Sequence, residues 1–405
     1  MKLQYNNLNF KDYDEYRLKV FFKQKYYFYL DKADIIQKIA KVKIDKDDSS
    51  IIYFDTDEKK AASNFDLFIE QGLDNLINSN KDKKTIYIYE DLIPLIGTNE
   101  FGIVDRDTSI IEIKSSTGCN LNCVFCSVSE GVNDKIDYLV EPDYLIKEVK
   151  KLVKKKTSEN IEINIGPQGE PLLYPDLVYF ITELKKIPKI KIISMNSNGR
   201  LLTKQLVQDL INAGLDRINL SVHNTDEVKQ KELSGSALSL ERLKELIDFS
   251  KGKLDFLLAP VYVPKLNEDI DGLIDFAKSY RNNFPIIGIQ NFLNYKGGRN
   301  PVKQKSFDDF YFMLRQLEKK YDIRLRLKPG DFNIKSDKVL IKPFKKGNII
   351  EAIVRIPGRR NKECIAYAKD RVITVFDCDF AAHKNKKVKI KLLRDKHNIF
   401  SGVLV

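Results

Sequence analysis

The stretch GCNLNCVFCSVSEG, residues 118–131, decides how the rest of the chain is interpreted. It places Cys119, Cys123 and Cys126 within eight residues, although the whole chain of 405 residues has only five cysteines. Thiolates are the usual ligands of iron–sulfur clusters, and three of them on one loop can hold one corner of such a cluster. A cluster held by only three cysteines leaves one iron open to an outside ligand. The spacing therefore predicts an iron–sulfur site of a catalytic kind.

A zinc site or a disulfide fits the three cysteines less well. A structural zinc site takes four ligands, normally as two separated pairs, and here the fourth would have to be Cys364, Cys378 or one of three histidines. None of these is near the loop in sequence. A disulfide would leave one thiol of the three over, and an odd cysteine count does not suggest a secreted disulfide framework. Zinc and unpaired buried cysteine stay open as alternatives.

The bulk properties indicate a globular protein of two or three domains. At roughly 100–200 residues per domain, 405 residues allow that number, and 43% hydrophobic residues suffice for a real core. The N-terminal sequence MKLQYNNLNFKDYDEYR lacks the apolar region of a signal peptide. No apolar run approaches the ~20 residues of a membrane span. We therefore expect a cytoplasmic protein that makes no use of a membrane.

Residues 105–330 repeat a strand–helix unit. Short apolar runs, typical of strands buried on both faces, alternate with amphipathic segments that begin and end at capping residues. Thr203 is a predicted N-cap and Gly214 a predicted helix stop. The expected strands are 109–115, 161–166, 190–197, 216–222, 254–263 and 286–293, and the expected helices are 141–156, 175–187, 203–214, 239–252, 267–280 and 306–321.

Such alternation implies parallel strands with right-handed crossovers. Six units are fewer than the eight of a closed barrel, so the pattern fits either a partial barrel or an open doubly wound sheet. In both architectures functional residues gather on loops at the carboxyl ends of the strands. The cysteine loop follows the first strand and therefore lies at that edge.

At this point the sequence resembles the radical S-adenosylmethionine superfamily. The match is Cys119-x-x-x-Cys123-x-Phe125-Cys126, including the aromatic residue before the last cysteine. The resemblance implies a partial (β/α)6 barrel with this loop after the first strand, a 4Fe–4S cluster on the three cysteines, and S-adenosylmethionine bound to the open iron. In the superfamily, reductive cleavage of that cofactor yields a 5′-deoxyadenosyl radical that abstracts hydrogen from substrate. The resemblance also implies a protein partner that supplies the electron, a reductant such as ferredoxin or flavodoxin.

Further segments resemble motifs of the superfamily that contact S-adenosylmethionine. GPQGEP (166–171) follows the second strand and resembles a Gly-Gly-Glu-Pro segment, with Gln168 departing from the first glycine. NSNG (196–199) follows the third strand and LSVH (220–223) the fourth. An ordinary glycine or proline turn is the alternative for each. The cofactor-binding residues implied by the resemblance are Phe125, Gly169, Glu170, Pro171, Ser197, Asn198 and Ser221. Arg299, in YKGGRNP (295–301) after the sixth strand, is a candidate for a contact to a substrate anion, and a glycine-rich solvated turn is the alternative.

Residues 1–104 are predicted to form a small N-terminal α/β domain without a chemical motif. The segments YRLKVFFKQKYYFYL (16–30) and KTIYIYEDLIPLIG (84–97) look like strands, and 30–43 and 65–79 look like helices. The aromatic–basic alternation of the first segment fits a substrate surface, but one face of an ordinary sheet explains it better.

The last segment, 335–405, holds nearly all the surplus charge. It has 18 Lys and Arg against seven Asp and Glu, a net charge of +11, whereas the residues before it have 51 against 50. Such a local concentration is typical of a surface that binds a polyanion. Five short predicted strands indicate a small antiparallel barrel.

This segment resembles the TRAM domain, an OB-like module that binds RNA. The resemblance rests on KKGNIIEA, AYAKDRVITV and KVKIKLLRDKHNIFSGVLV and is looser than that of the cysteine loop. Cys364 and Cys378 fall on neighbouring predicted strands, where buried thiols and a disulfide are the alternatives, and the resemblance to RNA methylases of the superfamily adds a methyl-relay pair as a third. Candidate phosphate contacts are Arg355, Arg359, Arg360, Lys384, Lys386, Lys387 and Lys389, and candidate stacking residues are Tyr367, Phe376 and Phe380.

Three functions follow. The first is a radical S-adenosylmethionine enzyme that modifies RNA, with tRNA as the expected substrate. The second keeps the radical chemistry but acts on a peptide or small metabolite. The third is a non-catalytic iron–sulfur RNA-binding protein. Methylthiotransferases also combine such a core with a TRAM domain, but they carry a second cysteine trio near the N-terminus, and residues 1–118 contain no cysteine.

Overall fold

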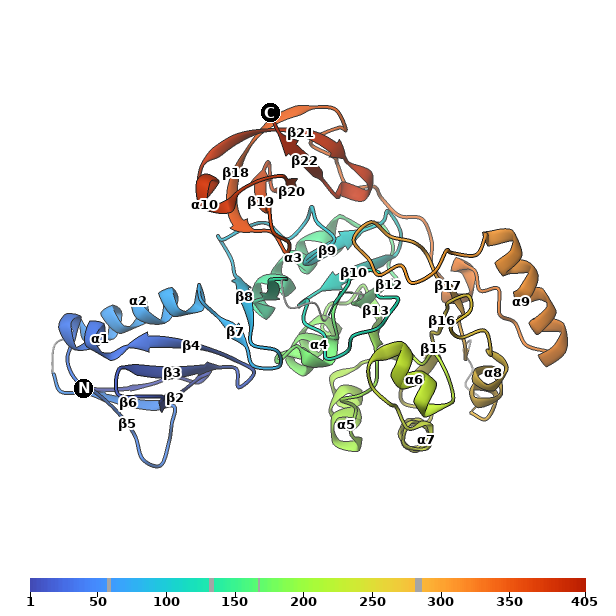
Figure 1. Ribbon diagram of the computed structural model, residues 1–405, viewed down its shortest axis with the longest axis horizontal. Helices are drawn as coiled ribbons and strands as arrows, with labels where there is room; N and C mark the ends of the chain where they lie inside the picture. Colours follow the sequence, from blue (N-terminus) through green and yellow to red (C-terminus); the bar gives the residue numbers. More distant parts are fainter. Residues whose placement is uncertain (57–59, 131–134, 167, 281–285) are drawn as a thin grey trace.

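The chain forms three lobes, namely an N-terminal lobe, a central α/β core and a C-terminal barrel (Figure 1). A computed structural model describes residues 1–56, 60–130, 135–166, 168–280 and 286–405. The N-terminal lobe lies at one side of the central α/β core, and the C-terminal barrel sits above that core. One apolar cluster runs through the first two lobes and reaches Ile356, Ile365 and Val372 of the barrel. The lobes are therefore packed together and not merely tethered.

The core sheet carries the predicted parallel strands. The strand order is β15-β14-β13-β12-β10-β9, and every neighbouring pair is parallel except the edge pair β9–β10. Beyond β15, a bridge from Leu258 to Ile287 and a short parallel pair, β16–β17, continue the curve. The strands are β9 (Gly102–Asp105), β10 (Ile110–Lys114), β12 (Ile161–Ile165), β13 (Ile190–Ser197), β14 (Arg217–Leu220), β15 (Asp255–Leu258), β16 (Val261–Tyr262) and β17 (Gln290–Asn291).

This arrangement confirms the predicted fold class, a mixed α/β fold of the partial-barrel kind. The sixth predicted strand is present only as the bridge at Ile287 and the two-residue β17. Strand β9 was not predicted, because the sequence gives no sign that a segment before the first unit joins the sheet as an antiparallel edge.

Amphipathic helices cover the outer face of the sheet. Thr203 accepts a hydrogen bond from the Leu206 amide at 3.1 Å, and Gly214 ends the same helix at φ +94°, so both predicted capping residues are confirmed. Helix α6 was not predicted. The helices are α3 (Pro142–Lys155), α4 (Leu177–Lys185), α5 (Lys204–Ala213), α6 (Glu227–Ser234), α7 (Leu240–Ser250), α8 (Asp271–Lys278) and α9 (Phe307–Tyr321), with 3-10 turns at Pro171–Leu173, Pro329–Phe332 and Lys396–Asn398.

The N-terminal lobe contains two sheets, ordered β11-β8-β7-β4-β3-β2 and β1-β6-β5. Its sheet extends past residue 104, because β11 from the core segment pairs in parallel with β8. The elements are β1 (Lys2–Gln4), β2 (Leu8–Asp12), β3 (Arg17–Phe22), β4 (Tyr26–Asp31), α1 (Lys32–Lys38), β5 (Val42–Ile44), β6 (Ile51–Phe54), α2 (Ala61–Leu73), β7 (Ile77–Asn78), β8 (Lys83–Ile88) and β11 (Asp137–Val140).

The aromatic–basic segment 16–30 folds as the hairpin β3–β4, which turns at Lys23 and Gln24 with positive φ. Its alternate residues Leu18 and Val20 are fully buried, whereas Lys19 lies 3.7 Å from the ring centroid of Tyr27 on the other face. The alternation is thus the two faces of one sheet, with cation–π contacts on the more open face.

The C-terminal lobe is a closed five-stranded barrel in the order β18-β19-β20-β22-β21. The predicted small OB-like barrel is confirmed, but it is not wholly antiparallel, since β20 and β22 run parallel. Closure removes the exposed strand edges of so small a sheet. The elements are β18 (Ile349–Pro357), β19 (Glu363–Ala368), β20 (Arg371–Phe376), α10 (Phe380–His383), β21 (Lys387–Arg394) and β22 (Ser401–Leu404).

The barrel docks on the core through main-chain hydrogen bonds. The Val372 amide donates to Ile96 at 2.8 Å, and the Phe400 amide donates to Gly97 at 2.8 Å. A Cβ on Gly97 would lie 2.1 Å from the Val372 carbonyl oxygen, so the contact requires glycine. Tyr138 of β11 is completely buried and donates its hydroxyl to Pro357 at 2.9 Å. No helix in the described ranges is long and apolar enough to cross a membrane.

Candidate iron–sulfur and cofactor site

The three cysteines lie on the loop that leaves the carboxyl end of β10. All three are free and partly buried. Within the described residues, no group of three or more Cys, His, Asp or Glu is gathered tightly enough for a single metal ion. A single zinc ion requires sulfur ligands at about 2.3 Å, and a four-iron cluster is a larger body whose cysteine ligands stand further apart.

The donor set fits a cluster chemically. The Leu121 amide donates to Cys119 Sγ at 3.4 Å, and the Glu130 amide donates to Cys126 Sγ at 3.2 Å. Main-chain N–H groups aimed at sulfur favour the thiolate that a cluster requires. Without the cluster, burial raises the pKa of Cys123 to about 12 and raises the pKa of Cys119 as well. Both thiols therefore hold their protons until a metal displaces them.

The C-terminal turn of helix α6 is hydrogen-bonded to the cysteine loop. The Asn122 amide donates to Ser234 at 3.1 Å and the Val124 amide donates to Leu233 at 2.9 Å, so the loop is tied to the last turn of the helix. Phe125, only 7% exposed, belongs to a small apolar cluster with Leu233. These contacts fix the aromatic residue between the second and third cysteines.

The GPQGEP segment lies against the start of the same loop. The Glu170 amide donates to the Gly118 carbonyl at 2.8 Å. Gly169 has φ +68°, and a Cβ there would lie 2.5 Å from the Gly118 oxygen, so only glycine allows this approach. Pro171 opens the 3-10 turn Pro171–Leu173, and Pro167 lies outside the described residues.

The Glu170 carboxylate is a structural tie. It is 2% exposed and accepts hydrogen bonds from the Ser197 hydroxyl and the Asn198 amide, both at 2.8 Å, and from the Leu172 amide. Burial raises its pKa to about 6, and these donors oppose the shift. Because both oxygens have protein partners, the carboxylate holds the second and third strand ends together.

The third and fourth strand ends complete the site. The Asn198 side chain donates to Asn120 Oδ1 at 2.8 Å, which joins the NSNG segment to the cysteine loop. The Ser221 amide donates to the Ser197 carbonyl at 2.8 Å. The structure thus brings all the predicted cofactor segments to one edge of the sheet. The contacts of their individual residues with S-adenosylmethionine stay predictions.

His223 is a site residue that the sequence analysis did not single out. It is 4% exposed, its ring lies 4.8 Å from that of Phe125 in an edge-on arrangement, and its Nδ1 accepts the Val261 amide at 3.2 Å. Burial lowers its pKa to about 4, so the ring is neutral and carries its proton on Nε2. The motif LSVH contains this histidine, but a histidine at a strand end can have many roles, so the motif alone did not indicate this one.

An amide ladder crosses the face of the sheet opposite the helices. Asn219 donates to Asn196 Oδ1 at 2.8 Å, and Asn164 donates to the Ser194 hydroxyl at 2.8 Å. These residues alternate with apolar residues such as Ile163 that pack under the helices. They provide a polar inner face of the sheet.

Arg299 is bound to the cysteine loop, and its contact to a substrate anion stays a prediction. Its guanidinium donates to the Cys123 carbonyl at 2.7 Å, to Asn122 Oδ1 and to the Glu130 carbonyl, and its own amide donates to the Cys126 carbonyl at 2.9 Å. The side chain is therefore a clamp on the cysteine loop, and these contacts explain it without a substrate anion.

Three of the predicted phosphate contacts are engaged within the protein. Arg359 is 4% exposed and ion-paired to Glu130 and Asp137, which removes it from any RNA-facing surface. Arg360 donates to Gly297 at 3.0 Å, and Arg355 donates to Asn385 at 2.9 Å and Leu92 at 3.3 Å. The sequence could not separate these arginines from solvated ones, because their partners lie far away in the sequence or across the barrel.

The predicted lysine contacts are exposed, and β21 adds one more. Lysines alternate with buried apolar residues along this strand, so they share its outer face. The predicted candidates Tyr367, Phe376 and Phe380 are partly buried. The exposed lysines are Lys384, Lys386, Lys387, Lys389 and the unpredicted Lys391.

Cys364 and Cys378 are fully buried free thiols in the barrel core. Cys364 Sγ donates to the Cys378 carbonyl at 3.3 Å, so the expected alternative of a disulfide is wrong.

Several known proteins are similar to this chain. The model of the radical SAM superfamily matches residues 113–277. "Uncharacterized protein MJ0103" of Methanocaldococcus jannaschii is 37% identical over 396 residues, covering 88% of this chain and 90% of that protein. A GTP 3′,8-cyclase of Thermodesulfovibrio yellowstonii is 33% identical over 147 residues, which span 36% of this chain and 44% of the cyclase. The crystal structure of Streptococcus suis SuiB bound to S-adenosylmethionine covers 80% of this chain and 71% of that chain at 16% identity and a TM-score of 0.40.

The chain belongs to the radical SAM superfamily. Its cofactors are accordingly a 4Fe–4S cluster and S-adenosylmethionine, and it is a radical SAM enzyme. When bound, this pair supplies a carbon-centred radical that abstracts hydrogen. Cys119, Cys123 and Cys126 are the residues that would hold the cluster.

Proposed function

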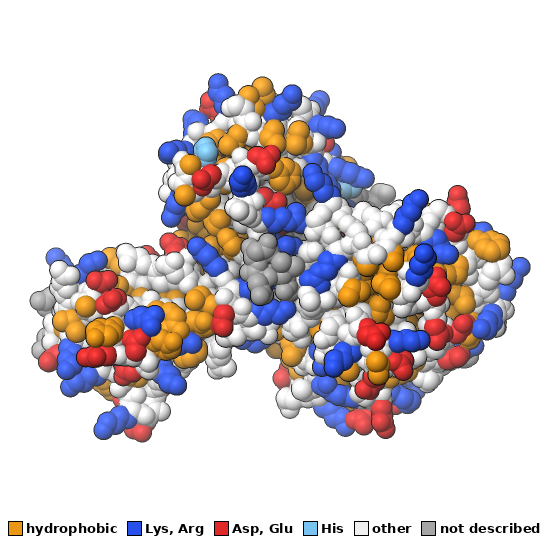
Figure 2. Space-filling view, in the orientation of Figure 1, with side chains coloured by type: hydrophobic (Ala, Val, Ile, Leu, Met, Phe, Trp, Pro, Cys, Tyr) orange, Lys and Arg blue, Asp and Glu red, His pale blue; other side chains and the backbone are white. Residues whose placement is uncertain are grey.

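We propose that this radical SAM enzyme modifies RNA, with tRNA as the substrate. The observation that carries the proposal is the exposed lysine strand of the OB-like barrel. Lys387, Lys389 and Lys391 lie on the outer face of β21, in a segment whose net charge is +11. β21 lies on the side of the barrel away from the core, and Figure 2 shows lysine and arginine side chains spread over this lobe.

The chemistry of a polynucleotide suits this surface. Phosphates are neutralised by such side chains in a manner that does not depend on sequence, and these contacts position the nucleic acid. Of the three lysines, Lys387 has an exposed ion pair with Glu351 at 3.4 Å, and such surface pairs contribute little. Apolar side chains, Ile349 at 59% exposure and Leu393 at 45%, adjoin the lysines and can pack against sugars or bases.

Binding of bulk tRNA at several salt concentrations tests the proposal. Replacing all three lysines by glutamate should weaken binding and lower the slope of log K against log salt by about 2–3, since each lost contact contributes roughly 0.7–0.9. The matched control replaces Lys150, Lys154 and Lys155 of α3, which are also exposed, by glutamate. If both triple variants bind tRNA as the parent does, the barrel is not the RNA surface.

Removing the whole barrel is a poorer experiment. Arg359 would leave with it, and the buried carboxylates of Glu130 and Asp137 beside the cysteine loop would lose their partner. Loss of activity would then follow whatever the substrate is. The charge-reversal variants avoid this because they leave Arg359 in place and change only exposed side chains of β21.

A small nucleotide is the second candidate substrate, favoured by the likeness of part of the chain to GTP 3′,8-cyclases. The rate of 5′-deoxyadenosine release distinguishes the two candidate substrates. An RNA-modifying enzyme should release it faster when tRNA is added, and a cyclase-like enzyme should release it faster when GTP is added. A non-catalytic iron–sulfur protein should release none. The reductant is proposed to be a low-potential carrier such as ferredoxin or flavodoxin.

A further inference from the structure

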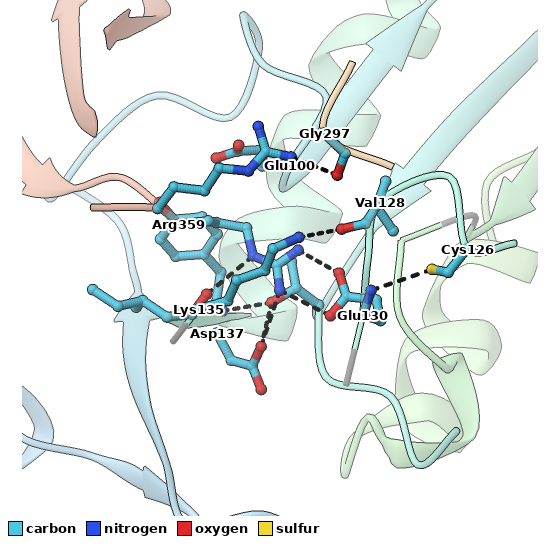
Figure 3. A network of polar contacts seen from close by, with 12 residues as sticks. Glu100, Cys126, Val128, Glu130, Lys135, Asp137, Gly297 and Arg359 are labelled. Atoms are coloured by element: carbon cyan, nitrogen blue, oxygen red, sulfur yellow. Dashed lines mark hydrogen bonds and ion pairs between the residues drawn. The ribbon is translucent and has the colours of Figure 1, made fainter. Parts of the chain in front are cut away.

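Glu130 is the meeting point of a buried polar network beside the cysteine loop (Figure 3). It is 4% exposed and follows the last cysteine by four residues. Its amide donates to Cys126 Sγ at 3.2 Å, its carbonyl accepts from Arg299, and its carboxylate accepts two hydrogen bonds from Arg359. Every polar group of this residue therefore has a partner, and one of those groups touches a cluster ligand.

Arg359 comes from the C-terminal barrel, in the turn between β18 and β19. It is as buried as Glu130, and Nη2 lies 3.0 Å from Glu130 Oε2 and 3.1 Å from Asp137 Oδ1. Its Nε donates to the Ile136 carbonyl at 3.0 Å, and its own carbonyl accepts the Ile136 amide at 3.1 Å. The planar guanidinium thus holds two carboxylates and one carbonyl in fixed directions, which lysine cannot do.

We propose that Arg359 is a positioning residue for the iron–sulfur cluster, acting through Glu130. By fixing the Glu130 carboxylate it fixes the Glu130 main chain, and so keeps the N–H group aimed at Cys126 Sγ. A second cation supports the same stretch, because Lys135 donates to the Val128 carbonyl. The barrel therefore completes the cluster site, whatever substrate it binds.

The physical consequence is a more easily reduced cluster. Reduction adds negative charge to the cluster and its sulfurs, and an N–H donor stabilises that charge. Losing the donor lowers the reduction potential and loosens the ligand. Partners that orient a metal ligand typically contribute 10- to 100-fold in metal affinity.

The test compares Arg359→Lys and Glu130→Gln with the control Arg355→Lys. Arg355 lies on β18, the strand that leads into the turn of Arg359, and its hydrogen bonds go to Leu92 and Asn385. The first readout uses the protein without its cluster: the rate at which Cys126 reacts with iodoacetamide, followed by mass spectrometry. We expect faster alkylation in both test variants, because the released loop opens Cys126 Sγ to the reagent and this outweighs the smaller thiolate fraction left without the N–H donor, and we expect no change in the control.

The second readout is the midpoint potential of the reconstituted cluster, from a redox titration by electron paramagnetic resonance. We expect it to fall in both test variants; a tenfold lower ratio of reduced to oxidised cluster at a given potential corresponds to ~59 mV. Iron affinity should fall by about tenfold. Folded test variants that match the control in alkylation rate and potential would overturn the proposal. A general loss of structure would instead speed alkylation of Cys364 and Cys378 too, and that result also counts against it.

Discussion

Gly169 offers a sharp test of how the cofactor segment is built. Its φ of +68° disfavours any other residue, and a Cβ would lie 2.5 Å from the Gly118 oxygen and 2.6 Å from the Thr117 oxygen. Both are main-chain atoms, so no flexible side chain can move aside. Gly252, at the turn after α7, has φ +76° but nothing within 4 Å of a Cβ. The two alanine variants therefore share the backbone strain and differ only in the collision.

The magnitudes follow from that difference. A left-handed conformation costs a non-glycine residue roughly 1–2 kcal/mol, which is the whole effect expected for Gly252→Ala. Gly169→Ala should add about 1–3 kcal/mol for overpacking. It should also push the segment off the cysteine loop and break the hydrogen bond from the Glu170 amide to Gly118. If the displaced segment loses one hydrogen bond to S-adenosylmethionine and this costs ~1.4 kcal/mol, binding of the cofactor weakens by about tenfold.

Urea unfolding gives the stabilities, and equilibrium binding of S-adenosylmethionine to the reconstituted protein gives the affinities. Gly252→Ala should lower the free energy of unfolding slightly and leave the affinity for S-adenosylmethionine unchanged. Gly169→Ala should lower the free energy of unfolding further and weaken S-adenosylmethionine binding about tenfold. Equal losses of stability in the two variants, with unchanged affinity in both, would refute the close approach of the two loops.

Further predictions concern buried charges. Burial raises the pKa of Glu100 to about 7, and its Oε2 has no partner among the described residues. The folded state therefore binds this proton more tightly than the unfolded state does. As a consequence, the free energy of unfolding should fall as the pH rises from about 4.5 to 7. The fall should be at most ~3 kcal/mol, because part of the residue is exposed to solvent. Glu100→Gln should abolish this slope in thermal melts at pH 5 and 8. Lys156 lies 2.8 Å from Asp105, both almost fully buried. Lys156→Met should cost about 3–5 kcal/mol in urea melts, and adding Asp105→Asn should recover much of it; equal stability of single and double variants would contradict this.

The sequence predicted the core because its signals are local. Parallel strands buried on both faces are read as apolar runs, and caps such as Thr203 mark the helices between them. The cysteine spacing and the order of the strands were then enough to place the predicted cofactor segments at one sheet edge. The loops did meet there, as the hydrogen bond between Asn120 and Asn198 shows.

What escaped prediction depends on contacts between distant parts of the chain. Arg359 and Glu130 are 229 residues apart, and only the docked barrel brings them together. Helix α6 has few apolar residues, although the cap at Asp226 and the left-handed Gly235 marked its ends. The pairing of β8 with β11 joins two segments that were assigned to different domains, and no local pattern announces it.

The most direct test of the central claim is the electron paramagnetic resonance spectrum of the anaerobically reconstituted, reduced protein, recorded without and with S-adenosylmethionine. In a 4Fe–4S cluster held by three cysteines, one iron has no protein ligand. S-adenosylmethionine binds to that iron, so adding it should change the spectrum. An unchanged spectrum, or zinc in place of iron in the purified protein, would contradict the account.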